Sequence, residues 1–389
     1  MTLSLAIVSD IHCHPKSSEY SDTLLFSDIS YKPEKQNPAA SLHQLIQEDG
    51  LKADILLMPG DMTNRADQQG INTAWATIES FAAQLNAPLI ASTIGNHDVA
   101  WQDPRDDVFR LGKNLHPHFP SKSNELSERF WSDGFFFEEQ PNYRILIINS
   151  AQNHTSQESA KKGSITERQL ESIDTYLQSA EKKKYQIALC HHHPIQHEEI
   201  TLGSVDLMTN GSRLVELLSR NRFSILIHGH KHHPRIRIDT SGGNTLPIFA
   251  AGSFAAGLKE GLGTRTRNVF HMIELNCDTA HNQVVGVIKT WQFQLQLGWT
   301  RAEQSAADFP FITGFGSGIT AEELAGKIEH AFSGFSEEVV LWEKIVTIVP
   351  QIKWTPPAVF RAAAELLQGK GITLYPSAPN WPKCIGIEK

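Results

Sequence analysis

Six short apolar runs, separated by helical patterns, restrict the fold of this chain more than any other feature of its sequence. Each run is rich in Ile, Leu and Val, which is typical of strands buried on both faces of a sheet. The runs span residues 3–8, 54–58, 88–93, 144–149, 185–190 and 223–228. Helical patterns occupy residues 39–48, 71–84, 166–180 and 211–220. This alternation of strand and helix predicts an α/β fold.

The pattern changes twice towards the end of the chain. Segments 234–240, 245–251, 268–275 and 283–293 follow one another closely, which predicts antiparallel strands. From about residue 300 the sequence predicts short helices. We therefore expect one domain over residues 1–298 and a small, mostly helical region over 299–389. Two stretches, 13–38 and 99–141, are expected to form long loops.

Polar residues of a few types follow five of the predicted strands. Ligands of open α/β sheets gather at the carboxyl ends of the strands, and residues two apart in an extended segment face the same way. We therefore expect these side chains to meet at one edge. They are Asp10 and His12, then Asp61, then Asn96, His97 and Asp98, then His191, His192 and His193, and finally His230 and His232.

The chemistry of this set indicates a transition-metal site. Carboxylate, amide and imidazole groups together suit Mn, Fe, Zn, Co or Ni ions, whereas Ca²⁺ prefers oxygen alone. Cysteine is nearly absent from these positions, which argues against structural zinc. The four cysteines, Cys13, Cys190, Cys277 and Cys384, lie far apart and show no disulfide framework. We therefore expect reduced thiols and a cytoplasmic protein.

The order of these motifs resembles that of the calcineurin-like metallophosphoesterase superfamily. The family series D-x-H, G-D, G-N-H-D/E, H and G-H-x-H is matched by "DIH", "GD", "GNHD", "HHH" and "GHKH". The resemblance spans about residues 3–290 and leaves 300–389 without a counterpart. It implies two packed mixed β-sheets flanked by helices, with a dinuclear metal centre in which Mn or Fe is favoured.

The resemblance also implies a role for each motif residue. One metal would be held by Asp10, His12, Asp61 and His232. The other would be held by Asp61, Asn96, His192 and His230, with Asp61 as the bridge. His192 is chosen from the three consecutive histidines because the family ligand often stands two residues before a proline, here Pro194. His191 and His193 have no assigned role at this stage.

The implied reaction is attack on a phosphoester by a hydroxide that bridges the two metals. His97 would assist the leaving group, and Asp98 would orient His97. The second motif, "GDMT", is similar to the form found in bacterial cyclic-nucleotide and glycerophosphodiester phosphodiesterases. We therefore predict a phosphodiesterase that acts on a small nucleotide or related diester.

Two other functions compete with this prediction. The first is a DNA or RNA nuclease acting with a partner protein, although a net charge of −8 disfavours a polyanion substrate. The second is a non-catalytic scaffold that binds a protein, or a second copy of itself, through residues 299–389. No apolar stretch approaches the roughly 18 to 20 residues of a membrane helix, so no membrane association is expected.

Overall fold

The computed structural model divides into two units. The structure describes residues 2–16, 22–29, 34–100, 107–115, 119–154, 156–196, 206–258, 266–278, 283–302, 309–377 and 381–387. The larger unit comprises Ser4–His271 and Gln292–Thr300. The other, here called the C-terminal unit, comprises Met1–Leu3, Met272–Trp291 and Arg301–Lys389. The domain boundary expected at residue 298 stays a prediction.

The first large sheet contains the first three strands of the predicted alternation. Its order is β12(Gly298–Arg301), β11(Gln283–Gln294), β10(Val269–Asp278), β1(Leu3–Ile7), β2(Ile55–Met58) and β3(Leu89–Ser92), with β13(Ile312–Phe315) also paired to β11. Strands β1, β2 and β3 run parallel, whereas β13 is antiparallel to β11. Every residue of β2 is buried, as its uninterrupted apolar run predicts.

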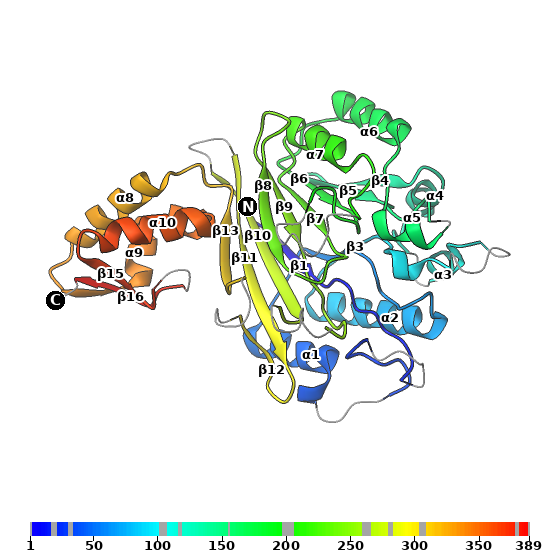
Figure 1. The fold of residues 1–389 in the computed structure, drawn as a ribbon, viewed down its shortest axis with the longest axis horizontal. Helices are drawn as coiled ribbons and strands as arrows, with labels where there is room; N and C mark the ends of the chain where they lie inside the picture. Colours follow the sequence, from blue (N-terminus) through cyan, green and yellow to red (C-terminus); the bar gives the residue numbers. More distant parts are fainter. Residues whose placement is uncertain are drawn as a thin grey trace. The chain divides into compact units, whose positions relative to one another are not determined.

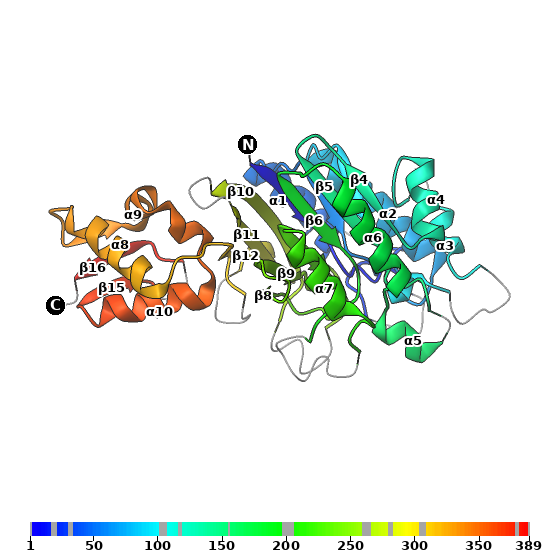
Figure 2. The ribbon, with the colours of Figure 1, turned by 90° about the horizontal axis from the view of Figure 1, so that it is seen from above.

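The second large sheet is also mixed. Its order is β4(Phe135–Glu139), β5(Tyr143–Ile148), β6(Tyr185–Leu189), β7(Ile225–His228), β9(Leu246–Ala250) and β8(Arg235–Asp239). Strands β5, β6, β7 and β9 are parallel, and the two edge strands are antiparallel. The expectation that 245–251 is antiparallel therefore holds only for its pairing with β8. Two mixed sheets flanked by helices confirm the predicted fold class (Figures 1 and 2).

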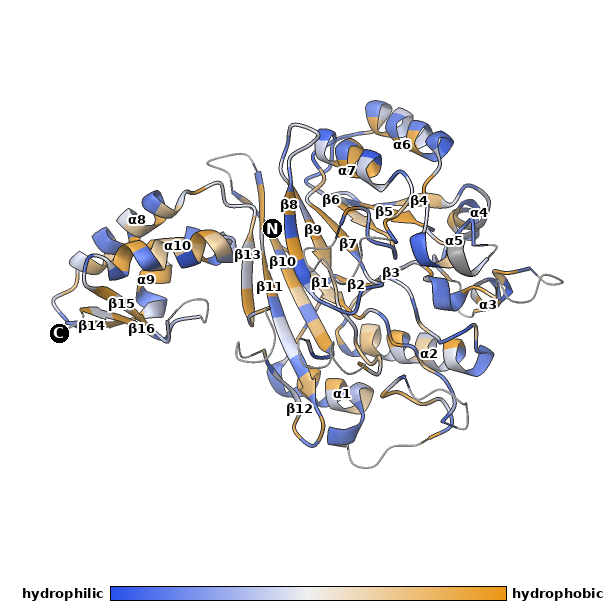
Figure 3. Ribbon diagram, viewed as in Figure 1, coloured by the Kyte–Doolittle hydropathy of each residue, from blue (hydrophilic) through white to orange (hydrophobic). Residues whose placement is uncertain are grey.

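Helices pack on the sheets with the faces that their periodicity predicts. Helix α2(Gln68–Gln84) contacts β2 and β3, and it lies beside α1(Pro38–Asp49). Helices α6(Glu167–Ser179) and α7(Gly211–Arg220) share a buried cluster with the second sheet. Helix α6 begins with the predicted capping box between Thr166 and Gln169. Figure 3 shows the second sheet mostly in hydrophobic colours and the exposed turns of α6 in hydrophilic ones.

The stretch 99–141 contains more structure than the long loop that we expected. Its described residues, which follow the 3-10 turn η2(Asn96–Asp98), include α3(Arg110–Lys113), α4(Asn124–Ser132) and β4. Phe130 is fully buried and makes edge-to-face contacts with Trp131 and Phe136. The apolar side chains therefore form a satellite core rather than a surface excursion. Residues 101–106 and 116–118 lie outside the described residues.

Residues 319–387 contain a small sheet that the sequence did not predict. The elements are α8(Ala321–Ser333), β14(Val339–Leu341), α9(Trp342–Ile348), η4(Pro350–Trp354), α10(Pro357–Gln368), β15(Ile372–Tyr375) and β16(Cys384–Ile387). The strands pair in the order β14-β16-β15 and are antiparallel. Helices and strands share one apolar core, which includes Leu324, Trp342 and Ile385. This order of elements is that of a helix-turn-helix followed by a two-stranded wing.

The structure has two further short elements, η1(Glu34–Gln36) and α5(Gln157–Lys162). No helix within the described ranges has both the length and the apolar character needed to cross a membrane.

Candidate dinuclear metal site

The ends of five strands bring the predicted site residues together in the larger unit. Asp10 follows β1, Asp61 follows β2, Asn96 follows β3, His191 follows β6 and His230 follows β7. Because all five strands are parallel within their sheets, their carboxyl ends lie at the same edges. The candidate site therefore lies where the alternation of strands and helices predicts a ligand.

The backbone at this edge is strained. Five site residues have a left-handed φ, between 51° and 78°, which non-glycine residues seldom adopt. They are Asp10, His12, Asp61, His230 and His232. Such residues each cost on the order of 1 kcal/mol and cluster at functional sites. The strain marks this edge independently of any sequence motif.

One group of side chains consists of Asp10, His12, Asp61 and His232, whose ligand atoms all lie within 4.8 Å of one another. His12 Nε2 lies 3.0 Å from His232 Nε2 and 3.5 Å from Asp61 Oδ2. His232 Nε2 lies 3.3 Å from Asp10 Oδ1. The side chains of Asp10, His12 and Asp61 are almost completely buried. Two carboxylates and two imidazoles therefore converge on one point.

A second group lies on the other side of Asp61. His191 Nε2 lies 3.2 Å from Asp61 Oδ2 and 3.2 Å from Asn96 Oδ1. His230 Nδ1 lies 3.0 Å from the same Asn96 oxygen. Thus Asp61 Oδ2 contacts a histidine of each group, His12 on one side and His191 on the other. One carboxylate oxygen joins the two groups.

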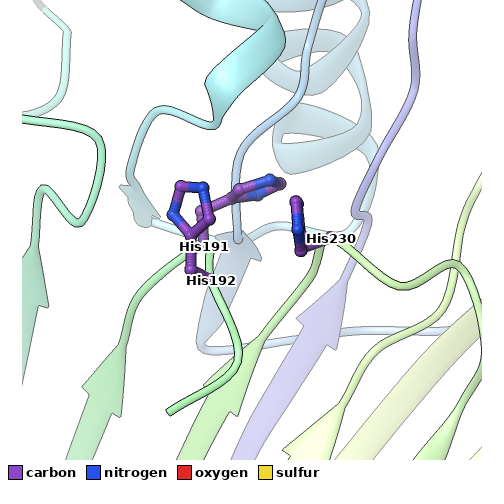
Figure 4. A group of neighbouring side chains, drawn as sticks. All are labelled: His191, His192 and His230. Atoms are coloured by element: carbon purple, nitrogen blue, oxygen red, sulfur yellow. The ribbon is translucent and has the colours of Figure 1, made fainter. Parts of the chain in front are cut away.

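The three consecutive histidines have different surroundings. His191 directs Nε2 towards Asp61 and Asn96, while its Nδ1 lies 3.0 Å from the Pro59 carbonyl oxygen. A backbone contact at the far nitrogen is the usual support of a metal-binding histidine. His192 lies near His191 and His230, and Figure 4 shows the three rings gathered beyond their strand ends.

Both nitrogens of His192 have partners away from Asp61. Its Nδ1 lies 2.8 Å from Ser150 Oγ, and its Nε2 lies 3.3 Å from the Ala160 carbonyl oxygen. A Cβ on Gly163 would lie 2.3 Å from Cγ of His192, so the ring is tightly enclosed. His193 is also buried, and its Nε2 lies 3.9 Å from Asp206 Oδ1.

Burial sets the charge state of most of these imidazoles. It lowers the pKa of His12, His192 and His230 well below the usual histidine range, and neighbouring imidazoles lower it further. These rings are therefore neutral near pH 7. A neutral imidazole keeps a lone pair, which is the form that binds a metal.

Asp61 and His191 behave differently because they face each other. Burial tends to raise the pKa of Asp61, but His191 and His97 outweigh it and hold that pKa well below its usual value. Burial tends to lower the pKa of His191, but the charge and hydrogen bond of Asp61 outweigh it and raise that pKa to about 9. The proton on His191 offsets the charge of Asp61, and a metal ion that binds this histidine would displace that proton. The donor types, their convergence and this charge balance fit a pair of metal ions.

His97 and Asp98 lie beside the two groups. The backbone N–H of His97 donates to Asp61 Oδ1 at 2.8 Å, and the ring lies edge-to-face on His12 at 4.6 Å between centroids. The partner of His97 Nδ1 is Asn64 Oδ1, at 2.7 Å. The Asp98 carboxylate instead accepts from the backbone N–H groups of Gly95 and Thr63.

Asn64 is thus a site residue that our sequence analysis did not single out. It lies three positions after Asp61, within the stretch "GDMTNR" of the second motif. That proximity was the one available signal, because the contact with His97 depends on the fold of two separate turns.

Two glycines allow the backbone to approach the carboxylates. A Cβ on Gly95 would lie 2.1 Å from Asp61 Oδ1, and a Cβ on Gly229 would lie 2.4 Å from Asp10 Oδ2. Both distances are far below van der Waals contact. Only glycine at these positions leaves the two carboxylates in place.

Comparison with models of known families matches residues 3–234 to the calcineurin-like phosphoesterases. The chain belongs to this family. That family is one of metal-dependent phosphoester hydrolases, which agrees with the donor types gathered at the strand ends. The matched residues contain every candidate ligand described above.

Solved structures similar to this phosphoesterase are distant in sequence. They include a purple acid phosphatase from yellow lupin seeds, with 16% identity, a TM-score of 0.45 and coverage of 76% of this chain and 52% of that chain. Another is GAP50, the anchor in the inner membrane complex of Plasmodium, with 13% identity, a TM-score of 0.43 and coverage of 79% and 91%. A sulfate thiohydrolase from Thermus thermophilus has 13% identity, a TM-score of 0.40 and coverage of 77% and 58%. This phosphoesterase spans about half the length of the lupin enzyme, and no curated protein matches it.

Proposed function

We propose that this phosphoesterase hydrolyses a phosphodiester of a small nucleotide or related molecule. The observation that carries the proposal is the position of Asp61 Oδ2, which lies 3.5 Å from His12 Nε2 and 3.2 Å from His191 Nε2. One metal would be held by Asp10, His12, Asp61 and His232. The other would be held by Asp61, Asn96, His191 and His230. Mn or Fe is favoured.

Our choice of His191 as a ligand departs from the sequence-based choice of His192. Three contacts support it: the approach of His191 Nε2 to Asp61 and to Asn96, and the bond of its Nδ1 to the Pro59 carbonyl. The nitrogens of His192 are occupied by Ser150 and Ala160. We therefore assign His192 to the support of the neighbouring rings.

When bound, two divalent ions polarise the phosphoryl group and lower the pKa of water between them. The protein contributes the negative charges of Asp10 and Asp61, while Asn96 and the lowered-pKa histidines add none. The pair of ions would therefore remain net positive at this site and attract an anionic phosphodiester. His97, fixed by Asn64, is placed to protonate the leaving oxygen.

The diester preference rests on sequence. The second motif "GDMT" and the histidines before Pro194 are similar to bacterial phosphodiesterases of small diesters. The test is hydrolysis with added Mn²⁺ of bis-p-nitrophenyl phosphate, p-nitrophenyl phosphate, cyclic mononucleotides and single-stranded DNA. We expect the diesters of small molecules to react fastest. Faster hydrolysis of the monoester would contradict the proposal.

A pair of alanine variants tests the choice of ligand. Replacing His191 with Ala should reduce hydrolysis by at least about a hundredfold and lower the metal content measured by mass spectrometry. Replacing His192 with Ala should leave close to two metals per chain. Loss of metal from the His192 variant alone would restore the sequence-based choice.

A nuclease is the second candidate, because residues 319–387 have the element order of a winged helix-turn-helix and many such modules bind DNA. Helix α10 carries only one Arg and one Glu, however, which provides no basic face for phosphates. We therefore expect no salt-dependent DNA binding in a fluorescence anisotropy titration. This region is better suited to a protein partner or a second copy of the chain, because its small sheet exposes the apolar side chains of Val339, Leu341 and Ile387.

All four cysteines are free, which supports a cytoplasmic location.

A further inference from the structure

A line of polar side chains extends from His97 away from the metal ligands. His97 Nδ1 lies 2.7 Å from Asn64 Oδ1, and Asn64 Nδ2 donates to Asp22 Oδ1 at 2.8 Å. Beyond it, His14 Nε2 lies 3.2 Å from the same Asp22 oxygen. Asp22 comes from the stretch 13–38, which the sequence predicted to be a long loop. This segment thus reaches His97 through a single intervening residue.

The hydrogen bonds in this line can have only one direction. An ionised carboxylate accepts hydrogen bonds and donates none, so the Asn64 amide must present its NH₂ to Asp22. The Asn64 oxygen then faces His97, and an amide oxygen only accepts. His97 must therefore carry a hydrogen on Nδ1. Asp22, which does not touch His97, determines which nitrogen of that ring is free to exchange a proton.

The backbone holds each member of the line in place. The N–H of Gly257 donates to the Asp22 carbonyl at 2.6 Å, and Thr23 Oγ1 donates to the Ile11 carbonyl at 3.1 Å. The N–H of Ala66 donates to the His97 carbonyl at 2.7 Å. The Asn64 side chain is buried, whereas that of Asp22 is 35% exposed. The backbone position of Asp22 is therefore fixed, while its carboxylate stays in contact with solvent.

We infer that Asp22 is a positioning residue, which orients the Asn64 amide and thereby fixes the orientation and tautomer of His97. The inference rests on the proposed function, in which His97 protonates the leaving oxygen. In that step water forms a new bond to phosphorus and the ester P–O bond breaks. The leaving oxygen keeps the electron pair and takes the proton from His97 Nε2. Water then returns a proton to that nitrogen.

The test compares leaving groups of different acidity. The substrates are methyl aryl phosphates whose phenols range from p-nitrophenol to unsubstituted phenol, hydrolysed by the full chain with Mn²⁺. In Asp22→Ala we expect kcat for the phenyl ester to fall about tenfold, a fraction of what a general acid contributes. The kcat for the p-nitrophenyl ester should fall less than about threefold, because p-nitrophenolate leaves without needing a proton.

A double variant distinguishes hydrogen-bond direction from simple packing. In Asn64→Asp alone, two carboxylates face each other, and we expect the phenyl ester to be hydrolysed more slowly than by wild type. In Asp22→Asn with Asn64→Asp, the new carboxylate accepts from His97 and from the new amide. Every donor again meets an acceptor, so hydrolysis of the phenyl ester should recover at least partly.

A matched control is Asp28→Asn, which changes another carboxylate of the same segment. Asp28 is exposed and accepts from the backbone N–H of Lys16, not from Asn64. Its replacement should leave the dependence on the leaving group unchanged. Metal content should stay near two per chain in all variants.

In Asp22→Ala, an equal loss of kcat for every ester, or no loss for any, would overturn the inference. Failure of the double variant to recover hydrolysis of the phenyl ester would overturn it as well. Absence of diester hydrolysis by the wild-type protein would instead overturn the proposed function. The wild-type measurement therefore separates failure of the proposed function from failure of the inference about Asp22.

Discussion

The backbone angles and buried side chains of the larger unit depart further from local conformational preferences than those of the C-terminal unit. Five site residues of the larger unit have left-handed φ angles, and its interior contains many buried histidines. In the described residues of the C-terminal unit, no residue other than glycine has a positive φ. The principal core of that unit is formed by apolar side chains such as Leu324, Trp342 and Ile385.

This difference shows where the protein departs from the most stable arrangement. Strained backbone and buried ionisable groups both lower stability, and they are retained where chemistry requires them. The C-terminal unit has no such cluster among its described residues, so its sequence is free to satisfy capping, packing and propensity together. Substitutions of the site residues in the larger unit should therefore remove activity, whereas substitutions in the core of the C-terminal unit should lower stability alone.

The largest effect is expected for Asp61→Asn. Hydrolysis of bis-p-nitrophenyl phosphate should fall by about a thousandfold or more, because the residue that joins the two ligand groups loses its charge. The thermal midpoint should fall as well, because Asn leaves the proton on His191 without its buried partner. Both are measured on one preparation, by a chromogenic assay and by calorimetry. Hydrolysis within about tenfold of the wild-type rate would contradict the comparison.

In the C-terminal unit, Leu324→Ala should lower stability without lowering activity. Leu324 is fully buried, so its truncation should lower the free energy of unfolding of that unit by about 2–5 kcal/mol. Phosphodiester hydrolysis at a temperature where the variant is folded should change less than about twofold, because no candidate ligand lies there. The measurements are urea unfolding and initial rates.

The matched control for this substitution is Leu366→Ala on α10, because Leu366 is 41% exposed. The Leu366→Ala substitution should lower the free energy of unfolding by less than about 1 kcal/mol. A large loss of activity in Leu324→Ala, with folding intact, would assign a catalytic role to the C-terminal unit and blur the distinction.

A buried histidine away from the site should give the larger unit a pH dependence. Burial lowers the pKa of His271 to about 3, and its Nε2–H donates to the Ala251 carbonyl at 2.9 Å. The unfolded chain binds this proton near pH 6.5. Stability is therefore fully present above that pH and is lost as the pH falls towards 3, by up to about 1.4 kcal/mol per unit.

Replacing His271 with Gln, which keeps a donor but does not titrate, should make this slope shallower. The measurement is urea unfolding between pH 6.5 and 4. His330→Gln, at an exposed position of α8, is the control and should keep the wild-type slope. An unchanged slope in the His271 variant would mean that other groups dominate acid unfolding.

The smallest effect concerns two of the helix capping boxes, one in each unit. Thr166 Oγ1 accepts from the Gln169 N–H at 3.2 Å, and Thr320 Oγ1 accepts from the Glu323 N–H at 3.2 Å. Thr→Ala at either position should lower the free energy of unfolding of its own unit by about 1 kcal/mol, and Thr→Ser should lower it less. Equal losses of stability, measured by calorimetry, would show that helix capping contributes equally in both units. A stabilising Thr320→Ala would contradict that.

The sequence predicted the strands that carry the candidate ligands because uninterrupted apolar runs and terminal polar residues are local signals. The resemblance selected His192 as the ligand, whereas we propose His191. Strand β6 ends at Leu189, and beyond that point strict alternation no longer fixes which way a side chain points. The contact of His191 with Asp61 depends on how two distant turns meet, which periodicity does not encode.

Physical reasons also explain why the sequence did not predict some features of the structure. Strands β14 and β16 have three and four residues, too short for alternation to be recognised. Strand β4 is an aromatic run, Phe135–Glu139, within a stretch whose turn residues indicated a loop. The position of Asp22 depends on a hydrogen bond from the backbone N–H of Gly257, which lies far along the chain.

The candidate ligands are spread from residue 10 to residue 232, so the order of synthesis separates them widely. Asp10 leaves the ribosome before the other candidate ligands, and His232 follows only when about 220 more residues have been translated. A nascent or prematurely terminated chain that ends before His232 lacks the complete set of candidate donors. The proposed metal pair can therefore be completed only after translation has passed that histidine.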